Sequence, residues 1–232
     1  MNTIDALAAR ILFEDNHLVI INKQASEIVQ GDKTGDTPLS EYVKAYIAHK
    51  YNKPGRVFLG VVHRIDRPVS GAVMFARTSK SLARINNMLR EGQIQKKYWA
   101  VVASKPPNDA GHLVHFLRKN EKQNKSYPQK EGTAGARRAE LKYKLIATSD
   151  RYYLLEVELL TGRHHQIRAQ LAAFGCPIKG DLKYGFDRSN KDGSIHLHAR
   201  SVEFVHPVSK ENLCITAPVP ENDTLWKSFT AS

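Results

Sequence analysis

The chain has 232 residues, of which 41% are hydrophobic, and this composition is sufficient to fill an ordinary globular core. Lysine and arginine together number 35 against 23 aspartates and glutamates, so the formal net charge is +12. Such an excess of positive charge favours a polyanionic partner such as nucleic acid, although charge of this kind can also serve only to keep a protein soluble. The two cysteines exclude a disulfide framework.

The first 20 residues lack both the basic start and the unbroken apolar stretch of a signal peptide, because Asp5, Arg10, Glu14 and Asp15 interrupt them. No apolar run of the sequence approaches the roughly 20 residues that are needed to span a bilayer. The two cysteines are not closely paired in the sequence, and a reducing compartment fits them best. We therefore expect a cytoplasmic protein with no membrane partner, and we expect it to be a monomer.

In the first half of the chain, short apolar runs alternate with stretches of helical spacing. Thr37 is expected to cap the first helix, with Pro38 in its first turn. The second helix is expected to carry Leu82, Ile85 and Leu89 on one apolar face, and Gly92 is placed to end it. The predicted elements are a strand over residues 18–21, a helix that includes 39–47, a strand over 71–76, a helix from 79 to about 91, and a strand over 97–103.

The second half begins with a polar stretch, residues 118–134, that has no periodicity and is predicted to be a solvated hairpin loop or a disordered surface excursion. Strands are predicted over 139–145, where apolar and charged residues alternate, and over 153–160. A helix that Gly175 closes follows. Runs of adjacent strands with few helices indicate the α+β class, with a mixed, largely antiparallel sheet flanked by helices. We expect one domain over residues 1–232, with its core over about 11–220.

An acid lies among potential cations in the segment His63-Arg64-Ile65-Asp66-Arg67, which is followed by Pro68-Val69-Ser70-Gly71. An ionised carboxylate at Asp66 would be stabilised by these neighbours. Asp66 could equally be a turn residue or one half of a salt bridge, and the spacing alone does not decide between these interpretations.

A second polar segment, Thr161-Gly162-Arg163-His164-His165-Gln166-Ile167-Arg168, leads into the helix that Gly175 closes. Arg168 follows Ile167 and so lies about 100° around the helix from an apolar position, at the flank of the buried face. A buried arginine there requires an acidic partner. A surface arginine would instead lay its apolar carbons beside the core and keep its charged end in water.

Four histidines raise the question of a metal site: His164, His165, His196 and His198. The sequence offers no well-spaced acidic or cysteine ligand to complete a set with them. Hydrogen bonds to backbone or to RNA phosphate are therefore the preferred interpretation, and we expect no metal.

The segment from His63 to Gly71 resembles the HRLDxxTSG signature of the RluA family of pseudouridine synthases, with Pro68-Val69 as a departure from it. Further motifs follow the order of that family over roughly residues 11–220, with Gln24 where a proline is common, and an ordered set of this kind is highly specific. These motifs are Asn22-Lys23, Lys97-Tyr98-Trp99-Ala100-Val101-Val102, the segment from Thr161 to Arg168, Gly180-Asp181-(two residues)-Tyr184-Gly185, and Leu197-His198-Ala199.

The resemblance implies an isomerase that extrudes a uridine from ribosomal or transfer RNA and converts it to pseudouridine without a cofactor. It implies no N-terminal S4 domain, since the catalytic pattern already starts near residue 11. Asp66 would act on the extruded nucleotide, either as nucleophile or as base, and pairing with Arg168 would orient its carboxylate. By the same resemblance the catalytic residues are Asp66, Tyr98 and Arg168, and the residues that contact RNA or substrate are His63, Arg64, Arg67, Arg163 and Leu197.

Two other functions compete with this interpretation. A non-catalytic RNA-binding protein would keep the fold and the positive charge without turnover, and a metal-dependent nuclease would use the histidines and be inhibited by a chelator. The presence of Asp66, Tyr98 and Arg168 together argues against the first alternative.

Overall fold

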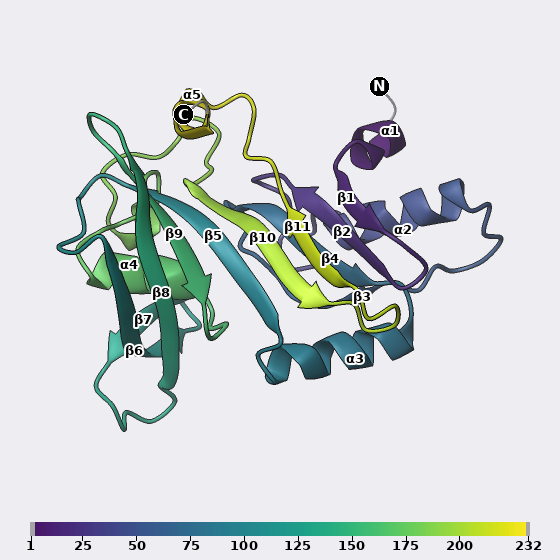
Figure 1. Cartoon of the computed structure of the whole chain (residues 1–232), viewed down its shortest axis with the longest axis horizontal. Coiled ribbons are helices and arrows are strands. Elements are labelled where there is room, and N and C mark those ends of the chain that lie inside the picture. Colours follow the sequence, from purple (N-terminus) through teal and green to yellow (C-terminus); the bar gives the residue numbers. More distant parts are fainter. Residues whose placement is uncertain (1–2, 231–232) are drawn as a thin grey trace. The chain divides into compact units, whose positions relative to one another are not determined.

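The computed structural model describes residues 3–230, which form an α+β structure in two compact units (Figure 1). Unit 1 comprises the residues up to Ile94 together with Ala199–Val219, and unit 2 comprises Gln95–His198 together with the residues from Pro220 onward. Among the described residues, eight pairs of neighbouring strands are antiparallel, in agreement with the largely antiparallel sheet that the runs of adjacent strands predict. No helix within residues 3–230 is both long and apolar enough to cross a bilayer.

Unit 1 is built on a sheet with strand order β1-β2-β4-β10-β11, and β3 pairs with β4 as well. The strands are β1 (Ile11–Glu14), β2 (Leu18–Lys23), β3 (Gly60–Val61), β4 (Ser70–Ala76), β10 (Leu197–Val205, its first two residues in unit 2) and β11 (Asn212–Thr216). The helices are α1 (Thr3–Ala8), α2 (Leu39–Lys50) and α3 (Ser79–Arg90).

The core of unit 1 explains why its elements form where the sequence predicts them. Every residue of β4 is buried, which accounts for the unbroken apolar run over 71–76. Ile85 of α3 is fully buried against this core, with Leu82 and Leu89 packed beside it, so the predicted apolar face of this helix is confirmed. Thr78 caps α3 by accepting from Ser81 N at 3.1 Å, and Gly92 follows its end with φ +70°.

The predicted cap of α2 is wrong. Pro38, and not Thr37, is the N-cap residue, and no side chain caps this helix. The first amides of the helix are satisfied by backbone instead, since Leu39 N donates to Ile28 O at 2.7 Å and Ser40 N donates to Val29 O at 3.3 Å. A preceding segment that lies against the helix start thus replaces the side-chain cap.

Unit 2 contains a sheet with strand order β5-β9-β8-β6-β7. In β8, Ala139, Leu141 and Tyr143 are buried and Lys142 and Lys144 are exposed, which confirms the predicted alternation. The strands are β5 (Ile94–Val102, its first residue in unit 1), β6 (Ala110–Asn120), β7 (Lys125–Gln129), β8 (Arg137–Thr148) and β9 (Tyr153–Leu159). The helices are α4 (Gln166–Ala173), the 3-10 turn η1 (Leu182–Tyr184) and α5 (Thr224–Thr230).

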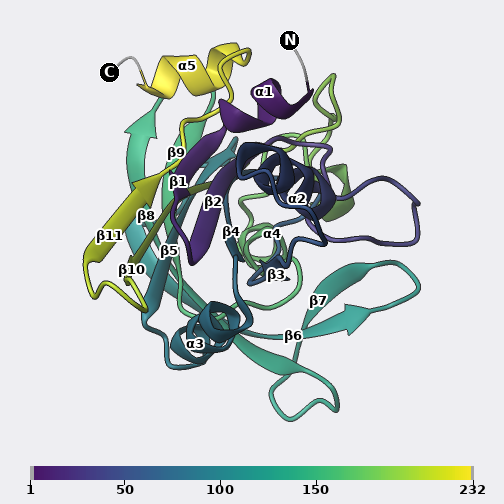
Figure 2. The ribbon, with the colours of Figure 1, turned by 90° about the vertical axis from the view of Figure 1, so that its right-hand side faces the viewer.

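Much of the segment 118–134 is not the loop that its composition suggests. The end of β6 pairs with β7 from Phe116–Gln129 to Asn120–Lys125, so that only a four-residue turn is irregular within this hairpin (Figure 2). The strands escape sequence analysis because both faces of the hairpin are largely polar, and a ladder of backbone hydrogen bonds requires no apolar period.

Gly71 gives a test of the sheet in unit 1. Its φ is +116°, and a β-carbon there would overlap the backbone of Ala199, with the Ala199 carbonyl carbon 2.8 Å away. We expect Gly71→Ala to lower the free energy of unfolding by more than about 3 kcal/mol, because backbone strain adds to steric overlap between two strands. Urea denaturation measures this loss.

The matched control is Gly132→Ala, where φ is also positive, at +80°, but no atom lies within 4 Å of the added carbon. This variant should lose only about 1 kcal/mol, from backbone strain alone. Equal losses in the two variants would contradict the close approach of Gly71 to Ala199.

Candidate active site

Asp66 lies in the loop that connects β3 to β4 in unit 1. Ile65 is 8% exposed and anchors the middle of this loop in the protein, while Asp66 is half-buried and Arg64 is exposed. Val69 N donates to Asp66 O at 3.0 Å and closes the turn that precedes β4. Arg64 and Asp66 are therefore accessible on a loop with a fixed base, which suits contact with a large substrate.

Two donors hold this loop through a single backbone oxygen. Arg67 O accepts from Ser26 N at 2.9 Å and from Lys23 Nζ at 3.2 Å, and Lys23 Nζ also donates to Gln24 O at 2.8 Å. At the start of the loop, Met74 N donates to His63 Nε2 at 3.2 Å. These contacts fix the backbone on both sides of Asp66.

Lys23 is fully buried beneath the loop. Burial lowers the pKa of its ammonium to about 7, although the nearby carboxylates of Glu27 and Asp66 act in the opposite direction. Its hydrogen bonds do not require a positive charge, since a neutral amine still donates to carbonyl oxygens. The sequence placed Lys23 in a motif, but its burial under the loop was not predicted.

The guanidinium of Arg67 contacts the segment before α2. Its Nη2 lies 2.7 Å from Asp36 Oδ2 and donates to Thr34 Oγ1 at 2.8 Å. The hydrogen bond from Arg67 lowers the pKa of the exposed Asp36 carboxyl. Arg67 thus ties the Asp66 loop to its neighbour, and its predicted contact with RNA stays a prediction.

In unit 2, Arg168 forms a two-point ion pair with Asp181. Arg168 Nε lies 2.6 Å from Asp181 Oδ2, and Nη2 lies 2.8 Å from Oδ1. The two residues are 5% and 1% exposed, so the expectation that a buried arginine takes an acidic partner is confirmed by Asp181. Asp181 belongs to the motif that begins at Gly180, and its pairing with Arg168 was not predicted. The pairing of Arg168 with Asp66 stays a prediction.

Tyr184 links this ion pair to the β6–β7 hairpin. The Arg168 guanidinium lies 5.1 Å from the centroid of the Tyr184 ring, and the Tyr184 hydroxyl accepts from Ser126 N at 2.8 Å. The same hydroxyl lies 3.0 Å from His165 Nδ1, and the His165 ring stacks on His164 at 3.8 Å. Burial, followed by the charge of Arg168, lowers the pKa of His165 to about 2, which keeps this ring neutral.

The other predicted site residues of unit 2 lie on separate elements. Tyr98 is 6% exposed on β5, and Leu197 is 4% exposed at the start of β10. Arg163 is exposed in front of α4 and donates through Nε to Arg138 O at 2.9 Å. The structure thus brings His63, Arg64, Asp66 and Arg67 onto one loop of unit 1, and it places Arg163 and Arg168 around the start of α4 in unit 2.

The histidines considered as metal ligands have other contacts. His196 Nε2 lies 3.1 Å from Asp223 Oδ2, its ring stacks on Trp226 at 5.3 Å, and the His198 ring lies 6.0 Å from the same indole. Within residues 3–230, no group of three or more histidine, cysteine, aspartate or glutamate side chains is arranged to hold a metal ion.

The lowered pKa of Lys23 should make the free energy of unfolding depend on pH. The pKa of Lys23 is lower in the folded protein than in the unfolded chain, so the unfolded chain binds more protons between pH 7 and 10.5, and stability rises with pH in that window. Lys23→Met removes this term. The stability of the wild type relative to Lys23→Met should therefore increase above pH 7, by at most about 1.4 kcal/mol per pH unit.

Urea denaturation at pH 7, 8 and 9 measures this difference. Lys80→Met removes an exposed lysine of α3 and corrects for the general effect of alkaline pH on a basic protein. A difference between wild type and Lys23→Met that does not change with pH would show that the buried amine does not titrate in this window.

The sequence and fold match known proteins over most of the chain. Residues 17–173 match the family model of RNA pseudouridylate synthase. Ribosomal large subunit pseudouridine synthase C of Buchnera aphidicola (subsp. Schizaphis graminum) is 33% identical over 233 residues, which cover 96% of this chain and 70% of that protein. The uncharacterized RNA pseudouridine synthase YhcT of Bacillus subtilis is 33% identical over 214 residues, covering 90% of this chain and 68% of that protein.

A solved structure agrees with this family at the level of the fold. Human RNA Pseudouridylate Synthase Domain Containing 4 superimposes with a TM-score of 0.80 and 23% identity, covering 94% of this chain and 92% of that chain. The α+β class predicted from the sequence is thereby confirmed. Because both the family model and the bacterial relatives extend over most of its length, this chain belongs to the RNA pseudouridylate synthase family.

Proposed function

We propose that this RNA pseudouridine synthase modifies uridine in ribosomal RNA of the large subunit. Several relatives with 30% identity or more carry the name ribosomal large subunit pseudouridine synthase C, among them the proteins of Buchnera aphidicola and Vibrio vulnificus. This shared name is the observation that supports ribosomal RNA over transfer RNA. The positive net charge of +12 suits either RNA and does not discriminate between them.

Asp66 is the residue to which we assign the chemistry. The reaction detaches uracil from ribose, rotates it and rejoins it through carbon, with no net change in atoms or electrons. A single carboxylate that attacks the nucleotide or accepts a proton from it is therefore sufficient. The half-buried position of Asp66 on a loop held by Lys23 and Ser26 supports this role. Both the nucleophile and the base mechanism use this carboxylate.

Arg168 is proposed to orient Asp66. Its Nε and Nη2 are held by Asp181, which fixes the plane of the guanidinium, and a guanidinium has donors for more than one carboxylate. Tyr98 is proposed to stack on the uracil, and Leu197 to form an apolar wall of its pocket. Both side chains are buried on strands of unit 2, which supports fixed positions for them.

Four basic residues are proposed to contact the RNA around the target. Arg64 is exposed beside Asp66 and is proposed to fill the gap that the extruded uridine leaves. His63, Arg67 and Arg163 are proposed to contact the neighbouring backbone. We further propose that the enzyme is a monomer with one catalytic domain and acts in the cytoplasm, where the bacterial relatives that are named for the ribosomal large subunit would meet their RNA.

Asp66→Asn tests the assignment of the reaction. Since pseudouridine carries the ribose on carbon 5, its formation releases tritium from RNA that contains uridine labelled at carbon 5. With a transcript of large-subunit ribosomal RNA, the variant should release tritium more than about a thousandfold more slowly than the wild type, because an amide neither attacks nor accepts a proton as a carboxylate does; this corresponds to about 4 kcal/mol of barrier.

The control for this prediction is Asp150→Asn, which alters an exposed aspartate in the turn before β9 and should keep wild-type turnover. Circular dichroism and RNA affinity of both variants should match those of the wild type. A rate for Asp66→Asn above a tenth of the wild-type rate would contradict the role of Asp66, and release from transfer RNA alone would contradict the ribosomal substrate.

Arg64→Ala separates base extrusion from backbone binding. If Arg64 fills the gap, a fluorescent base analogue beside the target uridine should report slower extrusion, while the dependence of affinity on salt stays the same. Loss of a phosphate contact would instead lower the log-log salt slope by about 0.7 to 0.9. Normal extrusion with a lower slope would make Arg64 a phosphate contact.

A further inference from the structure

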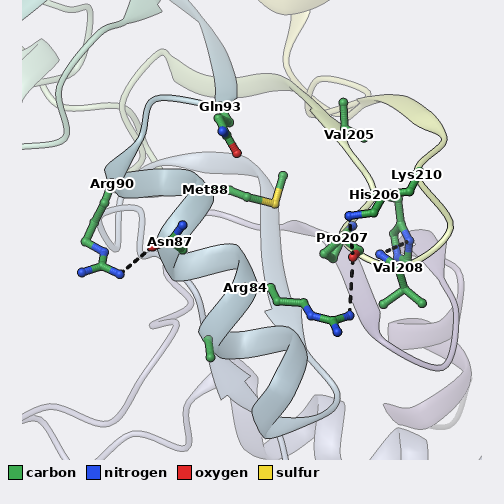
Figure 3. Close-up of a pocket in the computed structure, with 11 residues that line it drawn as sticks. Arg84, Asn87, Met88, Arg90, Gln93, Val205, His206, Pro207, Val208 and Lys210 are labelled. Atoms are coloured by element: carbon green, nitrogen blue, oxygen red, sulfur yellow. Dashed lines mark hydrogen bonds between the residues drawn. The ribbon is translucent and has the colours of Figure 1, made fainter.

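A groove of about 830 Å³ lies in unit 1 between α3 and the turn that joins β10 to β11 (Figure 3). Arg84 and Arg90 line it from α3, and Lys210 lines it from the turn. Met88 and Val208 contribute apolar surface. No aspartate or glutamate is found among the described residues that line the groove, so its ionised side chains have one sign of charge.

Two of these cations converge on one backbone oxygen. Arg84 Nη1 lies 3.5 Å from Pro207 O, and Lys210 Nζ lies 3.3 Å from the same atom (Figure 3 shows Arg84 directed towards Pro207 across the groove). A carbonyl oxygen carries only a partial charge, so it does not neutralise two full positive charges. An anion bound between them would lower their mutual repulsion.

The backbone conformation of Lys210 gives a second reason to regard its side chain as functional. Its φ is +66°, a left-handed conformation in which glycine is favoured and lysine is strained. Strain at a residue that is not glycine indicates a function for the side chain when another contact supports it. The hydrogen bond of the Lys210 ammonium to Pro207 O, the oxygen that Arg84 also reaches, supplies that contact.

The turn that carries Lys210 is held in one conformation by His206. This ring is 1% exposed, and its Nδ1 accepts from Ser209 N at 2.9 Å and from Val208 N at 3.3 Å. Lys210 N in turn donates to His206 O at 3.1 Å. A fixed turn reduces the ordering that a ligand would otherwise have to impose.

The groove is separate from the Asp66 loop. The loop precedes β4, and α3 follows β4, so the two lie towards opposite ends of this seven-residue strand, which is about 20 Å long. A DNA duplex carries one phosphate charge per roughly 1.7 Å of its axis, and an RNA duplex carries them at least as densely, so an RNA of this length presents more than about ten phosphates. A structured RNA with its target at Asp66 has the dimensions to reach the groove.

We propose that the groove formed by Arg84, Arg90 and Lys210 binds backbone phosphates of the substrate RNA at a distance from the modified uridine. The inference rests on the RNA substrate of this enzyme family and not on the ribosomal assignment or on Asp66. RNA is favoured over an acidic peptide because the enzyme must already bind RNA and its net charge is +12. Contacts of this kind add affinity without reading sequence.

The test measures the binding of the full chain to a fluorescent RNA duplex over a series of salt concentrations. The axis of the duplex is longer than the roughly 20 Å of β4. The triple variant Arg84→Gln, Arg90→Gln, Lys210→Gln should lower the log-log slope of affinity against salt by about two to three, since each lost phosphate contact removes 0.7 to 0.9. The control Lys44→Gln, Lys53→Gln, Arg56→Gln removes the same charge elsewhere in unit 1, away from α3, and should change the slope by less than about one.

A slope that is unchanged in the groove variant, or that falls equally in the control, would overturn the proposal. Loss of binding to polyglutamate with unchanged binding to RNA would also overturn it, in favour of an acidic protein partner. Because binding to a duplex does not require isomerisation, these outcomes do not depend on whether ribosomal RNA is the substrate.

Lys210→Gly serves as the second variant, because it removes the ammonium and relieves the strain of the left-handed backbone at once. It should melt at the same temperature as the wild type or higher, and its salt slope should be lower by about 0.7 to 0.9. A folded glycine variant with the wild-type slope would show that Lys210 does not contact RNA phosphate.

Discussion

The burial of Lys23 beneath the Asp66 loop is the constraint on which the site in unit 1 depends. A loop between two strands lacks the ladder of backbone hydrogen bonds that fixes a strand in a sheet. Here Lys23 and Ser26 supply donors that converge on Arg67 O. The contact requires a lysine at zero exposure, which lowers its pKa to about 7 and makes the charged form costly. The loop that presents Asp66 is thus fixed at the expense of folding stability, and this cost is largest below pH 7 and falls as the pH rises towards 10.5.

Arg168 is held in unit 2 by comparable means. A buried ion pair with Asp181 is weak support for stability, since removing two charges from water costs about as much as their attraction returns. The ion pair instead fixes the orientation of Arg168, because two parallel hydrogen bonds hold the guanidinium in one plane. Tyr184 extends this fixed group to the β6–β7 hairpin through Ser126, so a polar network that includes the neutral His165 sets the position of Arg168.

The sequence predicted those features that are determined by a single residue or by the regular spacing of apolar residues along one helix or strand. The apolar run of β4 and the face of α3 were predicted because local pattern and burial agree in them. The cap of α2 was not, because Ile28 and Val29, which are remote from any capping pattern, supply its acceptors. The polar β6–β7 hairpin has no period to detect. Likewise, motifs identified Lys23 and Asp181 as notable residues, but only tertiary structure shows what each of them contacts.

We propose that this chain makes pseudouridine in ribosomal RNA through Asp66. Mapping pseudouridines at single-nucleotide resolution across all RNA of a strain that lacks the gene tests this claim most directly, with complementation by the wild type or by Asp66→Asn. We predict that one or a few positions of large-subunit ribosomal RNA lose pseudouridine, and that only the wild type restores them. A complete set of pseudouridines in the deletion strain, or their restoration by Asp66→Asn, would contradict the account.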